Sequence, residues 1–300
     1  MSQPEYANRY PTLAFERFDD GVLVMRLQDP DGTTADYAQE HHEDWAPALR
    51  DIAADRENRV VIITGTGDAF IGSHGPWRER FTTPDHHEFT ARRQKMQYDY
   101  LFQIDCPVIG AVNGPSIHHS ELVVLNDIVL AADHAYFTDG HVYMGEPPAD
   151  GAHIFWQELL GPNRGKYFLL TGHKITAQQA QEIGFVNEVM PLDELMPRAL
   201  ELAHQLATFD TLALRFMRRA FVSRWQRIFR DDVGVGYGMA LEVMLHVDRA
   251  FNPWEAAEGE NQGEDELTKG LRSASGFTRP RASKPRSLFQ GQYGEPHTTD

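Results

Sequence analysis

The sequence predicts an α/β fold built on a partly parallel sheet. Three short runs support this prediction, because each is apolar, rich in β-branched residues and bounded by turn residues: VVIITG (60–65), PVIGAV (107–112) and DIVLAAD (127–133). Such runs are typical of strands that are buried on both faces. Segments with helical spacing separate them, and strands that alternate with helices favour parallel pairing.

The first elements are a hairpin and two helices. Residues 12–28 contain two strands on either side of Asp20-Gly21, a dipeptide that is common in tight turns. Apolar side chains then recur at helical spacing over residues 42–54. Residues 87–103 also favour a helix, which we expect to end before the next buried strand.

Beyond residue 153 the pattern becomes helical. Apolar side chains recur at helical spacing in five segments: 154–160, 165–170, 177–183, 195–207 and 211–228. From about residue 253 the chain is polar and rich in Gly, Pro and Ser, so it cannot bury enough apolar area to offset the entropy of ordering. The sequence therefore predicts a strand–helix core over 12–195, a helical region over 196–252 and a disordered acidic and polar tail over 253–300.

Composition limits the classes of partner and compartment. The formal net charge of −16 argues against nucleic acid and against an anionic membrane surface as partners. No run of about 18 apolar residues occurs, so no transmembrane helix is expected. The N-terminus lacks a signal-peptide pattern, and the single cysteine, Cys106, is expected in the core. These features favour a cytoplasmic protein.

Two local motifs have a plain structural interpretation. GTGDAF (65–70) follows a strand, but Phe70 replaces the third glycine of a dinucleotide-binding loop, so a strand-ending turn is the better interpretation. The basic segment 217–230 belongs to a helix, for which we predict one apolar stripe on the core and a charged face in solvent. That stripe consists of Phe216, Ala220, Phe221, Trp225 and Phe229.

Histidines near turns and strand ends are the main candidates for chemistry. Of the 14 histidines, His42, the pair His118-His119 and His141 stand beside such signals. His141 shares the turn-rich stretch FTDGHVYMGEPPADGAH (137–153) with Asp150, nine residues further on. The histidines show none of the HxxxH, HExxH or HxH spacings of metal sites. We therefore expect no metal and no cofactor.

Three ordered segments resemble the motifs of the enoyl-CoA hydratase/isomerase (crotonase) superfamily. In residues 107–133 a strand leads to Asn113-Gly114, then to a turn, to Glu121 at the start of a helix, and to a further strand. The loop 137–153 and the segment 170–195 follow with the spacing of the family's later motifs. The resemblance covers roughly residues 12–250. It implies a crotonase-like spiral of ββα turns over 12–195 and a C-terminal trimerisation region over 196–252.

The residues that carry the family's acyl-CoA chemistry differ. Family hydratases have a glutamate where this sequence has His141, and their Gly-Gly-Gly turn is replaced by His118-His119-Ser120. Their first oxyanion loop, Ala-Gly-x-Asp after a Phe, reads Ile71-Gly72-Ser73-His74 after Phe70. A glycine turn works because its backbone can approach a carbonyl closely. Histidines at these positions therefore indicate side-chain donors.

The departures resemble one branch, the 6-oxocamphor hydrolase type, whose members cleave a carbon–carbon bond of β-diketones without CoA. Segments 51–67 and 161–172 are also similar to that branch. Matched by motif, its His–Asp dyad falls on His141 and Asp150, and its other two active-site histidines fall on His119 and His42. A late-helix glutamate of the branch falls on Ala240, with Glu242 nearby.

The resemblance implies a retro-Claisen reaction that opens a cyclic 1,3-diketone to a keto acid. His141 would take a proton from water, which suits an imidazole with an ordinary pKa of about 6.5. Asp150 would hold the His141 ring in one tautomer, as the acid does in a Ser-His-Asp triad. His119 and His42 would donate to the developing enolate oxygen. We expect four further residues to bind or orient the substrate: Glu121, His118, Gly72 and Ser73.

Other readings of the residues stay open. An acyl-CoA hydratase or isomerase would need a glutamate at position 141 and a glycine-built oxyanion loop. A non-catalytic scaffold with this fold predicts that the polar residues do not converge, and a metal-dependent lyase requires a bound ion.

The expected partner is a small diketone, not nucleic acid or membrane. The resemblance also implies a homotrimer or a dimer of trimers.

Overall fold

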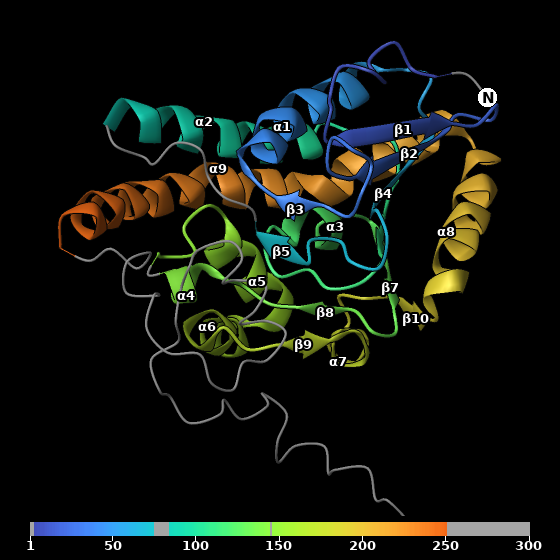
Figure 1. Cartoon of the computed structure of the whole chain (residues 1–300). Coiled ribbons are helices and arrows are strands. Elements are labelled where there is room, and N and C mark those ends of the chain that lie inside the picture. Colours follow the sequence, from blue (N-terminus) through green and yellow to red (C-terminus); the bar gives the residue numbers. More distant parts are fainter. Residues whose placement is uncertain (1–2, 75–83, 145, 251–300) are drawn as a thin grey trace, which may run out of the picture.

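The computed structural model describes residues 3–74, 84–144 and 146–250, and its centre is a six-stranded sheet in the order β1-β2-β4-β6-β7-β10 (Figure 1). β1 pairs with β2 antiparallel, and every other pair of neighbours is parallel. The predicted partly parallel sheet is thus confirmed. Its strands are β1 (Leu13–Arg17), β2 (Val22–Leu27), β4 (Val60–Gly65), β6 (Val108–Val112), β7 (Ile128–Ala132) and β10 (Glu188–Met190).

A second layer consists of very short strands. β3 (Asp36–Tyr37) pairs in parallel with β5 (Ser73–His74), and β8 (Tyr136–Phe137) pairs antiparallel with β9 (Ile175–Thr176). Single parallel bridges from Ser116 to Ile71 and to Phe137 connect these two pairs. After β4, β6 and β7 the chain therefore adds a short segment to the second layer before it returns to the main sheet. This repeat is the predicted ββα spiral.

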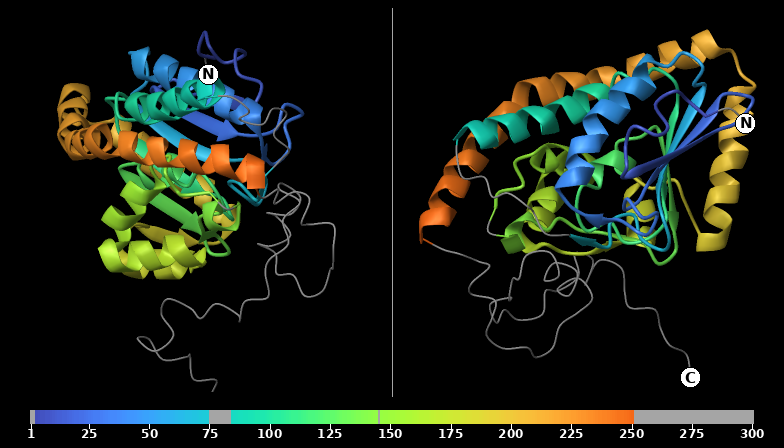
Figure 2. Two further views of the ribbon diagram at one scale, coloured as in Figure 1. Left: turned by 90° about the vertical axis from the view of Figure 1, so that its left-hand side faces the viewer. Right: turned by 45° about the horizontal axis from the view of Figure 1, so that its top comes forward.

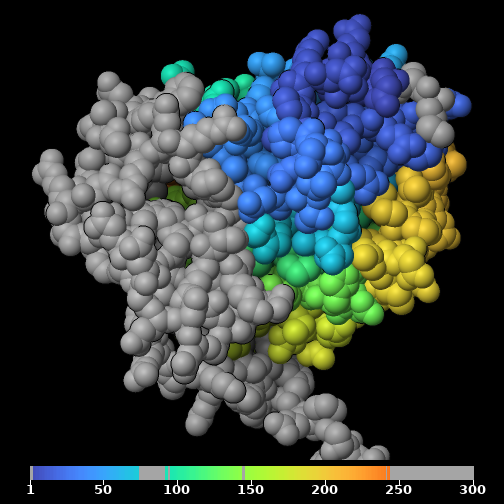
Figure 3. Space-filling view, viewed as in Figure 1, coloured from blue at the N-terminus to red at the C-terminus, as the bar shows by residue number. Residues whose placement is uncertain are grey.

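Helices cover both faces of the main sheet. α8 packs on β2, β4, β6 and β7, whereas α3 packs on β4 and β6. α1, α2 and α9 lie side by side in a separate layer (Figure 2). α8 also adjoins the β1–β2 turn at the surface (Figure 3), where His204 Nδ1 lies 2.6 Å from Asp20 Oδ2. The helices are α1 (Gln39–Ala54), α2 (Pro84–Leu101), α3 (Glu121–Val124), α4 (His141–Met144), α5 (Ala152–Leu160), α6 (Pro162–Thr171), α7 (Ala177–Ile183), α8 (Leu192–Ala207) and α9 (Thr211–Ala250).

The last helix is longer than the sequence pattern predicts. We expected it to end near residue 228, but α9 continues to Ala250 through the glycine-containing run VGVGYG (233–238). Gly236 lies close to the start of α5 and to the loop before it. An added Cβ would come within 2.4 Å of the Ala149 carbonyl oxygen and 2.5 Å of the His153 ring. Tertiary contact thus outweighs the low helix propensity of glycine.

The basic segment of α9 also differs from the prediction of one apolar stripe and one solvated face. Phe216 and Phe221 are 57% and 59% exposed, while Phe229 is buried. Arg218 is 1% exposed, and its guanidinium donates to Asp127 Oδ1 at 2.6 Å and to the Leu101 carbonyl oxygen. A buried arginine that pairs with a partly buried acid, and not the phenylalanines alone, therefore attaches this helix to the core.

The cysteine, the turn after β4 and the helices can each be compared with the sequence predictions. Cys106 is buried, as predicted. The segment after β4 is a turn in which the Asn113 side-chain amide donates to the carbonyl oxygens of Gly67 and Ala69. Within the described ranges, no helix combines the length and apolarity that crossing a membrane requires. The predicted tail, 253–300, lies outside the described residues.

We predict that Arg218→Met destabilises the protein by about 1–3 kcal/mol, because the substitution leaves the partly buried Asp127 carboxylate without its charged partner. Burial already raises the pKa of Asp127 against the opposing effect of Arg218. Urea unfolding followed by circular dichroism measures the change. Arg224→Met, which removes an arginine from the exposed side of the same helix, is the matched control and should change stability by less than about 1 kcal/mol. Equal effects of the two substitutions would contradict this account.

Candidate functional site

Histidine and carboxylate side chains converge beyond the second layer of strands. Because Ile71, Ser116 and Phe137 are bridged in parallel, the segments that follow them leave the layer at the same edge. Two residues beyond these three positions stand Ser73, His118 and Asp139. The spiral thus brings residues from three separate turns of the chain to one place. Seven residues of this region are buried: His42, His118, His119, Glu121, Asp139, His141 and Asp150.

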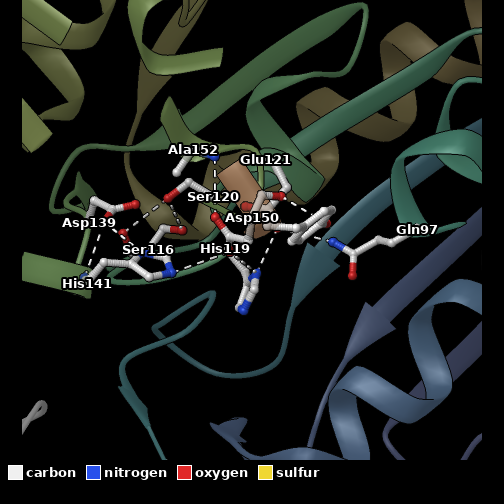
Figure 4. Close-up of polar contacts among 10 residues, drawn as sticks. Gln97, Ser116, His119, Ser120, Glu121, Asp139, His141, Asp150 and Ala152 are labelled. Carbon is white, nitrogen blue, oxygen red and sulfur yellow. Dashed lines mark hydrogen bonds and ion pairs between the residues drawn. The ribbon is translucent and has the colours of Figure 1, made fainter. Parts of the chain in front are cut away.

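His141, the first residue of α4, lies between two carboxylates (Figure 4). Its Nδ1 is 2.8 Å from Asp139 Oδ1, and the same oxygen accepts the His141 backbone N–H at 3.2 Å. On the other side of the ring, Nε2 is 3.5 Å from Asp150 Oδ2. The predicted partner Asp150 is therefore within reach of His141, but Asp139, which was not predicted, makes the shorter contact with the ring.

The charges of this group are strongly coupled. Burial alone would lower the pKa of His141, but the negative charges of Asp139 and Asp150 outweigh burial and raise it well above its ordinary value of 6.5. Burial likewise opposes ionisation of Asp150, yet His141 and, to a smaller extent, His119 hold its pKa well below the usual range. Both shifts favour the same state of the pair, an imidazolium next to a carboxylate.

The chain positions Asp150 through the residue that follows it. Asp150 Oδ1 accepts the Ala152 backbone N–H at 3.3 Å, at the start of α5, where the helix dipole favours negative charge. Gly151 has φ of +125°, and an added Cβ would lie 2.6 Å from the Tyr98 hydroxyl. Only glycine fits this conformation and this space, so Gly151 allows the carboxylate to turn into the site.

His119 forms a second histidine–carboxylate pair. Its Nδ1 is 2.7 Å from Glu121 Oε1, which also accepts a hydrogen bond from the Gln97 amide of α2 at 3.1 Å (Figure 4). The same Nδ1 lies 4.0 Å from Asp150 Oδ2. His119 has φ of +48°, which is uncommon for a residue other than glycine and indicates a conformation that its surroundings favour. Among the contacts of the described residues, its buried Nε2 makes no hydrogen bond.

The other two histidines join the cluster through ring contacts. The centroid of the His118 ring is 4.2 Å from that of His119 and 4.6 Å from that of His141. The His42 ring, on α1, meets His119 edge-on at 4.6 Å. Tyr37 packs behind them, with its ring centroid 4.7 Å from His119 and 5.2 Å from His42. The four histidines predicted from the sequence therefore form one continuous group.

The remaining sequence candidates lie at the edges of this group. Ser73 donates its hydroxyl to Asp36 Oδ1 at 2.6 Å, so a neighbouring strand already engages it, and Gly72 is half-buried next to it. On α9, Ala240 is buried and Glu242 is exposed. The late helix instead approaches through Tyr237, whose hydroxyl donates to the Asp150 carbonyl oxygen at 3.4 Å.

Asp139, Gln97 and Tyr237 were not among the sequence candidates. Asp139 carried a usable signal, since an Asp two residues ahead of a helix commonly accepts the backbone N–H that it meets there. Gln97 and Tyr237 lie on long helices far away in the chain, and no local pattern distinguishes them from neighbouring polar residues. Their contacts depend on how α2 and α9 pack.

One group of described residues has the donor types of a metal site. A ring nitrogen from each of His118 and His119 and a carboxylate oxygen of Asp150 lie within 4.8 Å of one another. Imidazole and carboxylate are ligands that Zn²⁺ accepts. His119 and Asp150 also take part in the histidine–carboxylate contacts described above, so these two residues can equally carry protons. The effect of a chelator on activity distinguishes a metal site from a proton-transfer site.

Comparison with known proteins identifies the family. The family model for enoyl-CoA hydratase/isomerase matches residues 17–232. The chain belongs to this family. The match extends from the end of β1 into α9 and thus includes the whole histidine cluster. The crotonase-like fold inferred from the sequence motifs is confirmed.

Individual relatives differ in their chemistry. The chain is 37% identical to a β-diketone hydrolase from the cyanobacterium Anabaena sp. PCC 7120, solved bound to (S)-3-oxocyclohexyl acetic acid; the match has a TM-score of 0.79 and covers 83% of this chain and 100% of that one. It is 27% identical to a probable mitochondrial enoyl-CoA hydratase of Dictyostelium discoideum, over 62% of this chain and 67% of that one. It is 32% identical to a crotonyl-CoA hydratase of Syntrophomonas wolfei, over 54% of this chain and 63% of that one. The match thus spans slightly less than two thirds of the Syntrophomonas protein.

We predict that Gly151→Ala destabilises the protein by about 1–3 kcal/mol, because alanine must adopt a rare backbone conformation against the Tyr98 side chain. Differential scanning calorimetry measures the loss. Gly234→Ala is the matched control, since Gly234 lies inside α9 with no atom within 4 Å of an added Cβ. It should raise stability by about 0.5–1 kcal/mol. A neutral Gly151→Ala would show that the loop around Asp150 is not constrained in this way.

Proposed function

We propose that the protein is a CoA-independent hydrolase that cleaves a carbon–carbon bond of a cyclic 1,3-diketone and releases a keto acid. The observation that carries this proposal is the buried convergence of four histidines, at positions 42, 118, 119 and 141, around Asp150. The 37% identity to a β-diketone hydrolase over the full length of that protein supports it.

The reaction sets two requirements on the site. Water must lose a proton as it adds to one carbonyl carbon, and the enolate that leaves when the carbon–carbon bond breaks must be stabilised and then protonated. The His141–Asp150 pair provides proton-transferring groups 3.5 Å apart. A water molecule within hydrogen-bond reach of both would meet the substrate carbonyl at this point.

His119 is suited to the enolate oxygen. Glu121 engages Nδ1, and the buried Nε2 makes no hydrogen bond among the described residues. When the ring carries both protons, Nε2 donates to the oxygen on which negative charge develops. A preorganised donor of this kind is typically worth about 3–4 kcal/mol in the transition state. The rings of His42 and His118 both pack against His119 and complete this group of imidazoles.

An acyl-CoA hydratase is the second candidate, because the two curated relatives named above are enoyl-CoA and crotonyl-CoA hydratases. Two observations argue against it. Position 141 carries histidine, and the turn that would present backbone N–H groups to a thioester carries the side chains of His118 and His119. Three buried carboxylates, of Glu121, Asp139 and Asp150, also favour a substrate that enters without negative charge.

We predict that the purified protein opens a bicyclic octanedione whose carbonyls flank one bridgehead carbon. Water addition and ring cleavage of this compound give 3-oxocyclohexyl acetic acid, the acid bound to the Anabaena enzyme. Loss of the dione and formation of the acid are followed by mass spectrometry. His141→Ala should lower kcat/KM by about 10²–10⁴-fold, whereas His134→Ala, at an exposed histidine, should leave it unchanged. Turnover of crotonyl-CoA in place of the dione would favour the second candidate.

We also predict that prolonged treatment with a chelator leaves the diketone activity unchanged, because the proposed steps use only protein groups and water. Activity before and after treatment, together with metal analysis of the same samples, provides the measurement. Loss of activity that returns with added Zn²⁺ would instead assign His118, His119 and Asp150 to a metal-dependent reaction.

A cytoplasmic location and assembly as a trimer or a dimer of trimers are also part of the proposal.

A further inference from the structure

His141 is held by carboxylates at both ring nitrogens, and this arrangement determines which way protons can move. Asp139 approaches Nδ1 at 2.8 Å and Asp150 approaches Nε2 at 3.5 Å. If the ring were neutral with its proton on Nδ1, the Nε2 lone pair would face the Asp150 carboxylate with no hydrogen between them. Two acceptors that face each other in a buried site repel. A ring that carries both protons satisfies both carboxylates.

We infer that in the proposed reaction His141 acts as the acid and Asp150 as the base, and that Asp139 is the positioning residue that holds His141 in its doubly protonated form. This assignment rests on the proposed function and differs from the roles that the sequence suggests, in which His141 is the base and Asp150 orients its ring. Asp139 is suited to positioning because one oxygen binds both the ring and the backbone N–H of His141. It thereby fixes the ring relative to the start of α4.

With these roles, every proton in the reaction has a donor and an acceptor. Asp150 takes a proton from water while the oxygen forms a bond to one carbonyl carbon. The bond between that carbon and the central carbon of the diketone breaks, which gives the carboxylic acid and an enolate. His141 donates its Nε2 proton to the enolate carbon, and Asp150 then returns the proton from water to Nε2. One water is consumed, and both residues regain their starting states.

The groups that face His141 favour the doubly protonated ring. Asp139 faces it from the loop after β8, and Asp150 faces it from the start of α5. Burial raises the pKa of Glu146, in the loop after α4, and the charge of His141 opposes that shift. The His118 ring, from the segment before α3, lies 4.6 Å away. The two carboxylates at the ring nitrogens therefore determine the charge state.

The test is the pH dependence of kcat/KM for the bicyclic dione in wild type and in Asp139→Asn. Because the acid must be protonated, activity should hold through neutral pH and fall as pH rises through the raised pKa of His141. Asp139→Asn removes one of the charges that raise this pKa, so the fall should move to lower pH by about one unit or more. Asp139→Glu keeps the charge and should keep the fall near its original position, even if kcat drops. Asp133→Asn, at an exposed aspartate beyond β7, is the control and should leave the profile unchanged.

A rise of kcat/KM as pH increases through the pKa of His141 would overturn the inference, because neutral His141 would then be the base. Imidazole resonances of the ligand-free protein, assigned with His141→Gln, give a second readout that does not depend on turnover. Their titration midpoint for His141 should lie above 6.5 in wild type and lower in Asp139→Asn. An unchanged midpoint in the variant refutes the role of Asp139. If wild type opens no diketone but the midpoint shifts, the proposed function fails and the positioning role survives.

Discussion

The site depends on mutual neutralisation of buried charge. An isolated carboxylate or imidazolium in the interior would shift its pKa until it lost its charge, but Asp139, His141 and Asp150 lie close enough to stabilise one another. A second histidine–carboxylate contact, between His119 Nδ1 and Glu121 Oε1, lies one turn of the spiral away. The 4.0 Å approach of His119 Nδ1 to Asp150 Oδ2 connects it with the first group. Because the charges of Asp139, His141 and Asp150 depend on one another, removal of one of these three residues changes the protonation of the other two. The five residues therefore form one connected unit.

The fold gives this unit its geometry. Parallel strands that leave the second layer at one edge deliver His118 and Asp139 from different turns of the chain. Two helices far apart in sequence then close around the loop that carries Asp150: Tyr98 of α2 packs on Gly151, and Tyr237 of α9 bonds the Asp150 carbonyl. The long helix is thus part of the wall of the site as well as of the outer layer.

The sequence predicted the main sheet and most helices, because fully apolar β-branched runs and helical spacing are local signals. It did not predict the two-residue strands β3, β5, β8 and β9, which are too short to show alternation, or the extension of α9 through three glycines. For the site, motif matching brought together His42, His119, His141 and Asp150, which the structure places in one cluster. It paired His141 with Asp150 alone, because spacing along a chain does not reveal which carboxylate reaches which ring nitrogen.

The left-handed backbone of His119 has a consequence for substitution at this position. Glycine would relax the backbone of the turn, but it would also leave the buried Glu121 carboxylate without its imidazole partner. The backbone conformation and the histidine–carboxylate contact therefore place opposite demands on one residue. The chain accepts an unusual turn at position 119 in exchange for a side chain that connects Glu121 with Asp150.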